Sequence, residues 1–434
     1  MEGSTWYGNV PNDWNVDRFK RIATIRNGQV DPEDDRYKDL PLFAPNHIES
    51  GTGRLLEVES ADAQGAESGK FLVEPGEVVY SKIRPELRKV IVAPFKGLCS
   101  ADMYPVRPAY QVEARFLYYE MLSDGFSQYT VLESDRVAMP KINRKALGEC
   151  IFVYPDRKQQ ARICEYLDSS CAAIDVAVAA KRRQIETLDA LRKATLHAAF
   201  ANESWPVERI KDVARKIGSG ITPEGGAAGY LEKGIPLLRS QNVHFDGLRL
   251  DDVAFISEDT HAAMLGSQLK PRDVLLNITG ASIGRCTFVP EDFGQGNVNQ
   301  HVCFIRVNHQ LDYRFLASFL ASPLGQGQVL SSFTGASRQG LSHKELGLIC
   351  IPLPSISVQR GVISKIEQHD ARQNRARGSI ETQIATLTAY RKSLIHECVT
   401  GQRRITEADS AGSPQADVTA AQRVEPSLSK LRQI

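Results

Sequence analysis

The stretch QIETLDALRK at residues 184–193 returns as QIATLTAYRK at residues 383–392, a shift of 199 positions. Both copies lie inside long segments, residues 159–200 and 359–399, that contain almost no Gly or Pro. Gly and Pro are the residues that destabilise helices most, so each segment is predicted to form one long helix. Each helix would hold roughly 40 residues and extend for roughly 60 Å.

A heptad of mainly apolar residues runs through both segments, in the same register after the shift of 199. Its a and d positions in the first segment are Cys164, Leu167, Cys171, Ile174, Val178, Lys181, Ile185, Leu188, Arg192 and Thr195. In the second segment they are Ile363, Ile366, Asp370, Gln373, Arg377, Ile380, Ile384, Leu387, Arg391 and Leu394. The shared stripe favours a mutual coiled coil over two separate surface helices. Its polar members either set the register or mark where the pair loosens and meets another protein.

The duplication extends well beyond the helices. The tripeptide at 115–117, Arg-Phe-Leu, returns at 314–316, and Trp14 and Val16 return as Trp205 and Val207 with an offset of 191. A unit this long lies far outside the range of solenoid repeats. We therefore predict domain 1 at residues 1–157, helix 1 at 158–200, domain 2 at 201–356 and helix 2 at 357–403. The polar tail at 404–434 lacks periodicity, and we expect it to be disordered.

Inside each predicted domain, short apolar runs are separated by turn residues. The runs at 71–73, 78–80, 90–92, 274–276 and 303–307 predict strands, and residues 112–122 and 313–320 predict helices. The fold class is therefore α+β, with two tandem domains separated by two long helices in a pseudo-two-fold internal repeat.

Composition gives no sign of a particular ligand, and the only compartment that it indicates is the cytoplasm. The 53 Lys and Arg residues almost balance the 52 Asp and Glu residues, so the basic excess of many nucleic-acid-binding proteins is missing. No apolar run approaches the roughly 18 residues of a membrane span, and residues 1–10 show no secretory signal. The eight cysteines form no C-x-x-C pair, which indicates neither a zinc site nor a disulfide framework. We expect a protein of the reducing cytoplasm.

The sequence lacks the motifs of common catalytic sites. It contains no phosphate-binding P-loop, no G-x-S-x-G nucleophile elbow and no H-E-x-x-H zinc motif. Its histidines do not cluster at metal-ligand spacing, and the acids at 33–35 sit in a turn-like context. We expect a non-catalytic chain that binds no metal or cofactor itself. A magnesium-dependent nuclease site stays open as a less favoured alternative, because its carboxylates need not be close in sequence.

Polar loops flank the predicted strands, and their side chains are of the kinds that read base edges and grip phosphates. In domain 2 the candidate DNA-binding residues are Thr222, Arg239, Ser240, Asn242, Thr279, Asn299, Gln300, Ser337, Arg338 and Gln339. In domain 1 they are Ser81, Lys82, Arg84, Arg88, Lys89 and Lys141. Taken singly, such loops are also ordinary surface turns, and such basic runs are also solvated faces.

In their order, these segments resemble the specificity subunit of type I restriction-modification systems. The matching stretches are GSGITP at 218–223, IPLLRSQNV at 235–243, KPRDVLLNITGASIG at 270–284, NQH at 299–301 and TGASRQGLS at 334–342. The stretch PGEVVYSKIRP at 75–85 resembles the family's other common version of the same segment. The resemblance covers about residues 6 to 403 and depends on the order and duplication of the motifs.

The resemblance implies that each domain is a target-recognition domain for one half of a split site in double-stranded DNA. It implies that the helices pair antiparallel as a spacer, through Leu167, Ile174, Val178, Ile185, Leu188, Ile366, Ile380, Ile384 and Leu387. It also implies a non-catalytic subunit that docks two modification subunits, which methylate adenine with S-adenosylmethionine. Restriction/translocase subunits that use ATP and Mg would join them. A chain with two diverged halves can read an asymmetric bipartite site, whereas a symmetric dimer reads a palindrome.

Domain 1 departs from this pattern. Residues 100–102, Ser-Ala-Asp, stand where domain 2 has Asn299-Gln300-His301, and residues 138–140, Ala-Met-Pro, stand where it has Ser-Arg-Gln at 337–339. The two domains should therefore read different sequences. Two other functions stay open: a self-contained nuclease or methyltransferase that acts on DNA, and a coiled-coil scaffold whose paired domains bind proteins.

Overall fold

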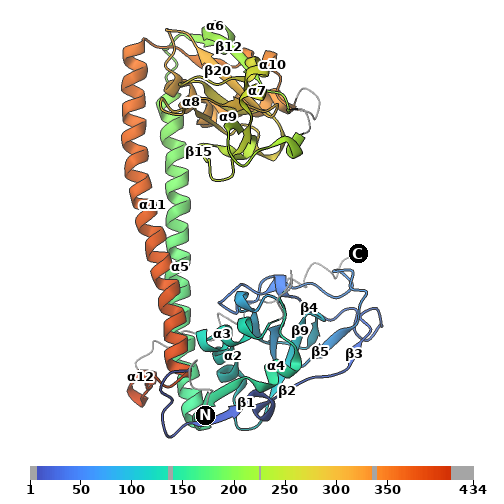
Figure 1. Ribbon diagram of the computed structural model, residues 1–434. Coiled ribbons are helices and arrows are strands. Elements are labelled where there is room, and N and C mark those ends of the chain that lie inside the picture. Colours follow the sequence, from blue (N-terminus) through green and yellow to red (C-terminus); the bar gives the residue numbers. More distant parts are fainter. Residues whose placement is uncertain (1–6, 135–139, 224–225, 335–339, 412–434) are drawn as a thin grey trace, which may run out of the picture. The chain divides into compact units, whose positions relative to one another are not determined.

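The structure is a computed structural model that describes residues 7–134, 140–223, 226–334 and 340–411 (Figure 1). It divides into unit 1, Met1–Lys181 with Thr382–Ile434, and unit 2, Arg182–Glu381. Each unit holds one α+β domain and its share of two long helices, α5 (Arg157–Phe200) and α11 (Ile356–Val399). Because this division runs through both helices, the predicted domain boundaries stay predictions. The predicted α+β fold class is confirmed.

The domain of unit 1 is built on two four-stranded sheets. The first is antiparallel and has the order β2 (Ala23–Ile25), β9 (Met103–Pro108), β6 (Val78–Ser81), β7 (Val90–Val92). The second has the order β3 (Gln29–Val30), β5 (Lys70–Val73), β8 (Gly97–Cys99), β4 (Leu42–Phe43), with β4 parallel to β8. Strand β6 is buried at every position, as expected for the apolar run of a central strand.

Short helices complete the core of this domain. They are α1 (Phe19–Ile22), α2 (Ala114–Leu122), α3 (Asp124–Leu132) and α4 (Arg144–Glu149), with the single turns η1 (Pro45–His47) and η2 (Pro85–Leu87). Strand β1 (Asn15–Arg18) pairs with β10 (Ile151–Tyr154), which leads directly into α5. Phe116 and Leu117 of α2 are fully buried in one core with Cys164 and Leu167 of α5.

The domain of unit 2 repeats this plan. Its antiparallel sheet has the order β12 (Ala214–Ser219), β20 (Val302–Val307), β17 (Val274–Asn277), β18 (Cys286–Phe288). A smaller sheet has the order β16 (Ala254–Ile256), β13 (Ile235–Leu238), β19 (Asn297–Val298), with β13 parallel to β19. Two further pairs are β11 (Val207–Arg209) with β21 (Cys350–Pro352), and β14 (Val243–His244) with β15 (Gly247–Leu248).

The helices of unit 2 follow the order of those of unit 1, with α7 as an addition. They are α6 (Ile210–Val213), α7 (Glu258–Ala263), α8 (Tyr313–Ala321), α9 (Pro323–Thr334) and α10 (His343–Leu348), with the turns η3 (Gly226–Gly229), η4 (Ser240–Asn242), η5 (Leu265–Ser267) and η6 (Gly280–Ser282). The strands and helices predicted from apolar patterning are confirmed. Patterning does not predict α3 and α9, whose sequences are interrupted by Gly and Ser.

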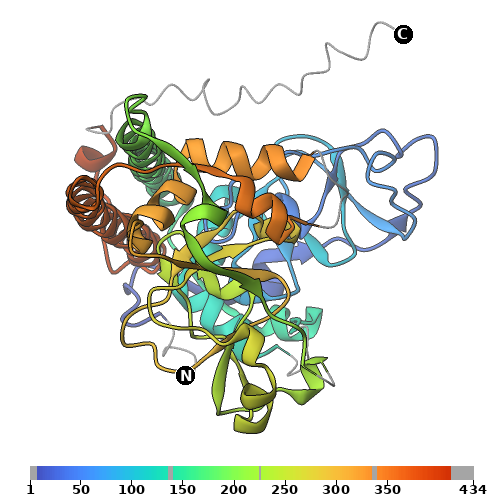
Figure 2. The ribbon, with the colours of Figure 1, turned by 90° about the horizontal axis from the view of Figure 1, so that it is seen from above.

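The two long helices lie side by side, as Figure 2 shows in a view close to their axes. All predicted a and d positions are buried or half-buried, and most residues between them are exposed. In unit 2 the helices run antiparallel, because Asp189 pairs with Arg377 while Arg192, further along α5, pairs with Asp370, earlier on α11. In unit 1 Leu167 and Cys171 share one core with Leu394 and Cys398. The predicted coiled coil is confirmed.

The polar members of the stripe specify how the helices align within unit 2. Arg192 donates two hydrogen bonds to Asp370, of 3.1 and 2.9 Å, and the Gln373 amide donates to the Leu188 carbonyl at 3.3 Å. A shift of the helices by one turn would separate these half-buried partners, and unpaired charges away from water are costly. Of the two interpretations of the polar positions, the structure supports the setting of register.

One buried glutamine joins each domain to the first turn of its long helix. In unit 1 the Gln160 side chain accepts from the Glu113 amide at 2.8 Å and donates to the carbonyls of Gln111 and Pro155, both at 2.9 Å. In unit 2 Gln359 accepts from Asp312 at 2.8 Å and donates to Gln310 at 2.9 Å and Pro354 at 2.8 Å. Both glutamines are 0% exposed. A side-chain amide whose oxygen and nitrogen are both hydrogen-bonded to the domain fixes that domain in position and orientation.

The tail after α11 is partly structured, so the prediction of disorder from residue 404 is wrong for residues 404–411. Ile405 is 3% exposed in the core of unit 1, and its carbonyl accepts from the Gln159 amide at 2.8 Å. The short helix α12 (Glu407–Ala411) follows, and the Thr406 hydroxyl donates to Asp409 at 2.7 Å. One apolar residue and one local cap order a segment that composition alone suggests is free. Residues 412–434 lie outside the described residues.

Replacing Gln359 by Leu should lower the free energy of unfolding by about 2–4 kcal/mol, because three buried backbone groups are left without their partner. Chemical denaturation of the full chain measures this change. The matched control is Gln368→Leu, since Gln368 lies exposed on the same helix and its replacement should have little effect. Equal stabilities of the two variants would contradict the anchoring role of Gln359.

Glu120 of α2 generates a pH-dependent prediction. Its side chain is 0% exposed, and one carboxylate oxygen accepts from the Val153 amide at 3.1 Å. Burial raises the pKa of this carboxyl well above its ordinary value. The stabilisation is therefore complete below the ordinary pKa of about 4.3 and is lost as the pH rises towards the raised value, because only the unfolded chain gives up the proton freely.

Glu120→Gln should therefore raise the melting temperature by several degrees at pH 8 and change it little near pH 4. The amide keeps the size and the acceptor of the acid but cannot ionise. Thermal unfolding across this pH range measures the difference, with Glu165→Gln on the exposed side of α5 as the control. A difference that does not vary with pH would contradict the burial argument.

Candidate nucleic-acid interface

The polar loops of unit 2 meet at one end of its antiparallel sheet. Strand β17 ends at Asn277, and the next residue, Ile278, donates its amide to the His301 carbonyl at 3.0 Å, just before β20 begins. The Ile278 carbonyl accepts from the Leu341 amide at 2.8 Å. The Gly220 amide, after β12, donates to the Asn299 carbonyl at 3.1 Å. Four loops distant in sequence are thereby held together; we call these backbone bonds the loop frame.

Four side chains on this frame form one continuous chain of hydrogen bonds. The Thr222 hydroxyl donates to the Gln300 amide oxygen at 2.6 Å. The Gln300 amide nitrogen lies 3.0 Å from Nε2 of His301, whose Nδ1 lies 2.6 Å from the Thr279 hydroxyl. Gln300 is exposed, and its amide keeps one N–H and one lone pair for a further partner. Such a donor and acceptor side by side match the major-groove edge of adenine.

The other described candidates of domain 2 have partners within the fold, and among them Asn299 contacts this chain of hydrogen bonds. Asn299 is 7% exposed and accepts from the His301 amide at 3.1 Å. Asn242 is 1% exposed and holds the carbonyls of Arg249 and Asp252, and Arg239 donates to the same Asp252 carbonyl at 3.0 Å. The Ser240 carbonyl accepts from the Asn277 side chain at 2.7 Å. These side chains and backbone groups are already engaged within the fold, in contrast to the exposed Gln300.

Two functional candidates in unit 2 have no signal of their own in the sequence. His301 bridges Gln300 and Thr279, and His343, at the start of α10, lies 3.0 Å from the Ser219 hydroxyl. A lone histidine is common in any chain, and only proximity reveals these partners. The predicted Ser337, Arg338 and Gln339 lie outside the described residues, just before Gly340.

Unit 1 repeats two of the three backbone bonds of the loop frame. Lys82, after β6, donates its amide to the Asp102 carbonyl at 3.0 Å, and its carbonyl accepts from the Ile142 amide at 3.0 Å. The shift of 199 relates Asp102 to His301 and Ile142 to Leu341. The backbone bonds are thus repeated, whereas the side chains that they present are different.

The side chains on the frame of unit 1 are basic and aromatic. Lys82 lies over the Tyr104 ring with Nζ 5.5 Å from its centroid, and the Arg144 guanidinium lies 5.2 Å from the same centroid. Lys141 is exposed beside Ile83, with which it forms a β-bridge, and Arg84 is exposed in a left-handed backbone conformation at φ 48°. Cations next to an aromatic face are suited to phosphate and base contacts. Sequence reasoning missed Tyr104 and Arg144 in this role.

Three of the residues predicted for domain 1 have partners within the fold. Arg88 forms an ion pair with Asp124 at 2.6 Å and donates to the Leu122 carbonyl at 3.3 Å. Lys89 donates to the Pro45 carbonyl at 2.6 Å. Ser81 is 2% exposed and donates to the Ile83 carbonyl at 3.0 Å. The structure therefore separates these three residues from the exposed Arg84 and Lys141.

Within the described residues, no group of three or more His, Cys, Asp or Glu side chains is arranged to hold a metal ion. No helix in the described part of the chain is both long and apolar enough to cross a membrane.

Comparisons with known proteins agree with one another. No protein-family model matches the chain. The EcoDI type I restriction enzyme specificity subunit of Escherichia coli is 33% identical over 227 residues, covering 52% of this chain and 48% of the relative. The EcoBI specificity subunit of Escherichia coli is 23% identical over 318 residues, covering 66% and 65%. The MjaVIII specificity subunit of Methanocaldococcus jannaschii is 21% identical, covering 83% and 87%.

The match thus spans about half of the EcoDI subunit and just under two thirds of the EcoBI subunit. A solved chain, from work on complex assembly and conformational transition of the type I restriction-modification system, shares the fold. Its TM-score is 0.73 at 17% identity, with 91% of this chain and 100% of that chain covered. The chain is a homologue of the specificity subunits of type I restriction enzymes.

Proposed function

We propose that this chain is the DNA sequence-recognition subunit of a type I restriction-modification complex. Its two domains bind the halves of an asymmetric bipartite site in double-stranded DNA, and the chain itself performs no catalysis. Two modification subunits, using S-adenosylmethionine, methylate adenine at the site, and restriction/translocase subunits, using ATP and Mg, join them in the cytoplasm. The names of the homologous proteins support this assignment.

The observation that carries the proposal is one loop frame presenting two different sets of side chains. In unit 2 the amide of Ile278, just after β17, donates to the His301 carbonyl at 3.0 Å. In unit 1 the amide of Lys82, just after β6, donates to the Asp102 carbonyl at 3.0 Å. Unit 2 presents the hydrogen-bonded side chains that link Thr222 to Thr279, and unit 1 presents Lys82 beside the Tyr104 ring. A duplicated catalytic site would keep its reactive groups in both copies. Divergence on a constant frame instead favours two readers of different sequences.

The long helices suggest how the half-sites are spaced. Each has 44 residues, which corresponds to about 66 Å of helix. A turn of DNA is about 34 Å, so a helix of this length suits half-sites separated by one to two turns with unread bases between them.

The experiment that tests this function is a map of adenine methylation in the source cell with and without the gene. We expect one split, asymmetric methylated motif to disappear with the gene. If the motif persists, the purified full chain should be titrated with DNA at several salt concentrations. Salt-independent or absent binding would favour the protein-binding scaffold, and DNA cleavage or methylation by the chain alone would favour the self-contained enzyme.

Gln300→Ala should relax recognition at one base pair of the half-site read by unit 2, at a cost of about 1–3 kcal/mol there. The expected reason is the removal of the amide that pairs with adenine. Binding selection on a randomised half-site measures the effect, and Gln310→Ala, exposed and outside the hydrogen-bonded chain, is the control. An equal drop in affinity for every sequence would instead place Gln300 on the DNA backbone.

Lys82→Ala combined with Lys141→Ala should weaken binding almost uniformly across sequences. For every phosphate that a lysine no longer neutralises, the slope of log affinity against log salt should fall by about 1. The control is Lys365→Ala, because Lys365 is exposed on α11 away from the loop frame. An unchanged salt slope would exclude the two lysines from binding to phosphate.

A further inference from the structure

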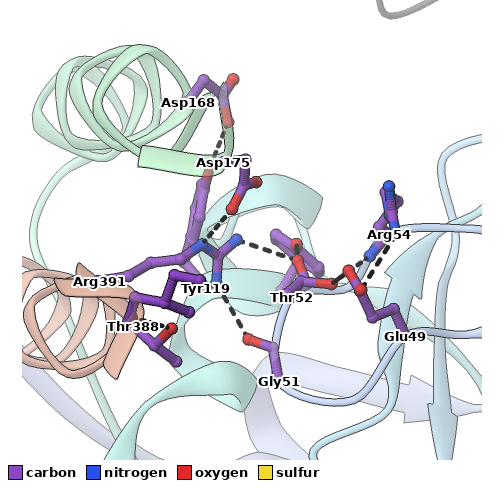
Figure 3. Close-up of polar contacts among 11 residues, drawn as sticks. Glu49, Gly51, Thr52, Arg54, Tyr119, Asp168, Asp175, Thr388 and Arg391 are labelled. Atoms are coloured by element: carbon purple, nitrogen blue, oxygen red, sulfur yellow. Dashed lines mark hydrogen bonds and ion pairs between the residues drawn. The ribbon is translucent and has the colours of Figure 1, made fainter. Parts of the chain in front are cut away.

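Arg391 of α11 is nearly buried, at 6% exposed, and its guanidinium reaches from the helix into the domain of unit 1. It donates to the carbonyls of Gly51 and Thr52, each at 3.0 Å (Figure 3). Its Nε lies 3.5 Å from a carboxylate oxygen of Asp175 on α5. The planar guanidinium thus connects three separate pieces of unit 1: α11, α5 and the loop at residues 49–54.

That loop is itself tightly braced. The Thr52 hydroxyl donates to Glu49 at 2.7 Å, and Arg54 donates to the same carboxylate at 3.0 Å, as Figure 3 shows. Tyr118 of α2 donates its hydroxyl to the Thr52 carbonyl at 2.9 Å. Gly53 has φ 68°, and a Cβ there would lie 2.3 Å from the Tyr118 hydroxyl, so only glycine suits this position.

The loop also contacts the segment that carries the recognition residues of unit 1. The Gly51 amide donates to the Leu87 carbonyl at 3.2 Å, and Lys89 donates to Pro45 at 2.6 Å. Leu87 ends the turn η2, which follows Arg84 directly. A continuous path of hydrogen bonds and backbone therefore leads from the helix pair, through Arg391 and the loop, to the neighbourhood of Lys82.

The equivalent arginine of the repeat is used differently. A shift of 199 takes Arg391 to Arg192, which donates two hydrogen bonds to Asp370 across the helix pair of unit 2. The same shift takes Asp370 to Cys171, which is 4% exposed. Unit 1 has a thiol where unit 2 has a carboxylate, so Arg391 lies beside Asp175, one turn further along α5, and donates to the loop carbonyls instead.

Other links between domain and helix are duplicated, which makes the difference at Arg391 specific. Arg115 pairs with Asp168 in unit 1, and the residues 199 positions later, Arg314 and Glu367, pair in unit 2 at 3.2 Å. Replacing a buried ion pair by apolar side chains of similar volume is often neutral or stabilising, so burial of Arg391 is not by itself an argument for a role in stability. The position of Arg391 therefore points to a role in orientation.

We propose that Arg391 is a positioning residue that locks the loop at 49–54, and with it the recognition segment of unit 1, onto the helix pair. By holding this domain at one angle, it restricts the number of base pairs accepted between the two half-sites. This inference rests on the proposed function and adds to it a residue that touches no DNA. The spacer is then set by the domain attachment as well as by the length of the helices.

The first test is hydrogen exchange of the full chain carrying Arg391→Met, which keeps an unbranched, flexible side chain and removes the guanidinium and its charge. Amides at 47–56 should exchange at least about tenfold faster than in the wild type, because the loop opens locally without its clamp. The control is Arg192→Met, which removes the helix-to-helix ion pair of unit 2 and should leave exchange at 47–56 unchanged. Unchanged exchange in Arg391→Met would overturn the clamp.

The second test is selection of bound DNA from a library of split sites with varied spacers. Arg391→Met should accept spacers one base pair longer and shorter while reading the same bases, and Arg192→Met should keep the wild-type spacer. A drop in affinity that is equal for all spacers would overturn the positioning role. If the wild type itself selects no split site, the proposed function fails, whereas exchange at 47–56 still reports whether Arg391 holds the loop.

Cys171→Asp provides a variant that keeps Arg391 in place. It supplies the carboxylate found at the equivalent position of unit 2, so Arg391 should turn to the helix pair and release the loop. We expect faster exchange at 47–56 and the same broadened spacer selection as in Arg391→Met. The proposal would be contradicted if Cys171→Asp showed the exchange rate and the spacer selection of the wild type. This holds whether Arg391→Met also behaves like the wild type or fails to fold.

Discussion

The rest of the structure depends on a buried side-chain amide at the first turn of each long helix. Gln160 and Gln359 each satisfy three backbone groups, with one bond to the strand-to-helix turn and two to the start of the domain's main helix. An amide surrounded on all sides tolerates neither sliding nor rotation, because each displacement leaves a buried polar group without a partner. Each domain is thereby attached rigidly to a helix, and the loop frame inherits that orientation.

The two units share one way of attaching the domain to its long helix, whereas the side chains on their loops differ. Two of the three backbone bonds of the loop frame are found in both units, since they depend on strand geometry and not on side-chain identity. The side chains that project from the frame are under no such constraint. Ala101 and Asp102 therefore stand in unit 1 where Gln300 and His301 stand in unit 2. The same division appears in the helices at Arg192 and Arg391.

The recognition loops are partly predictable from the sequence. Thr222, Thr279 and Gln300 are polar residues beside strand ends, and strand ends of one sheet lie together, so these three meet in the structure. The basic run of domain 1 is less informative, because a lysine or arginine beside a strand serves the fold as readily as a ligand. Arg88 pairs with Asp124, a residue from a helix that patterning does not predict.

The sequence by itself determined the duplication, the α+β class, the two long helices and their shared apolar stripe. These follow from periodicity and from the placement of Gly and Pro, which are local properties of the chain. Only the tertiary structure decided which partner each polar residue takes. Arg192 meets a carboxylate 178 positions away, and Arg391 meets a carbonyl 340 positions away. The two residues share one heptad position, and packing decides between their partners. Arg192 meets the carboxylate at 370, whereas Arg391, with a thiol at 171, meets the loop carbonyls and the carboxylate at 175.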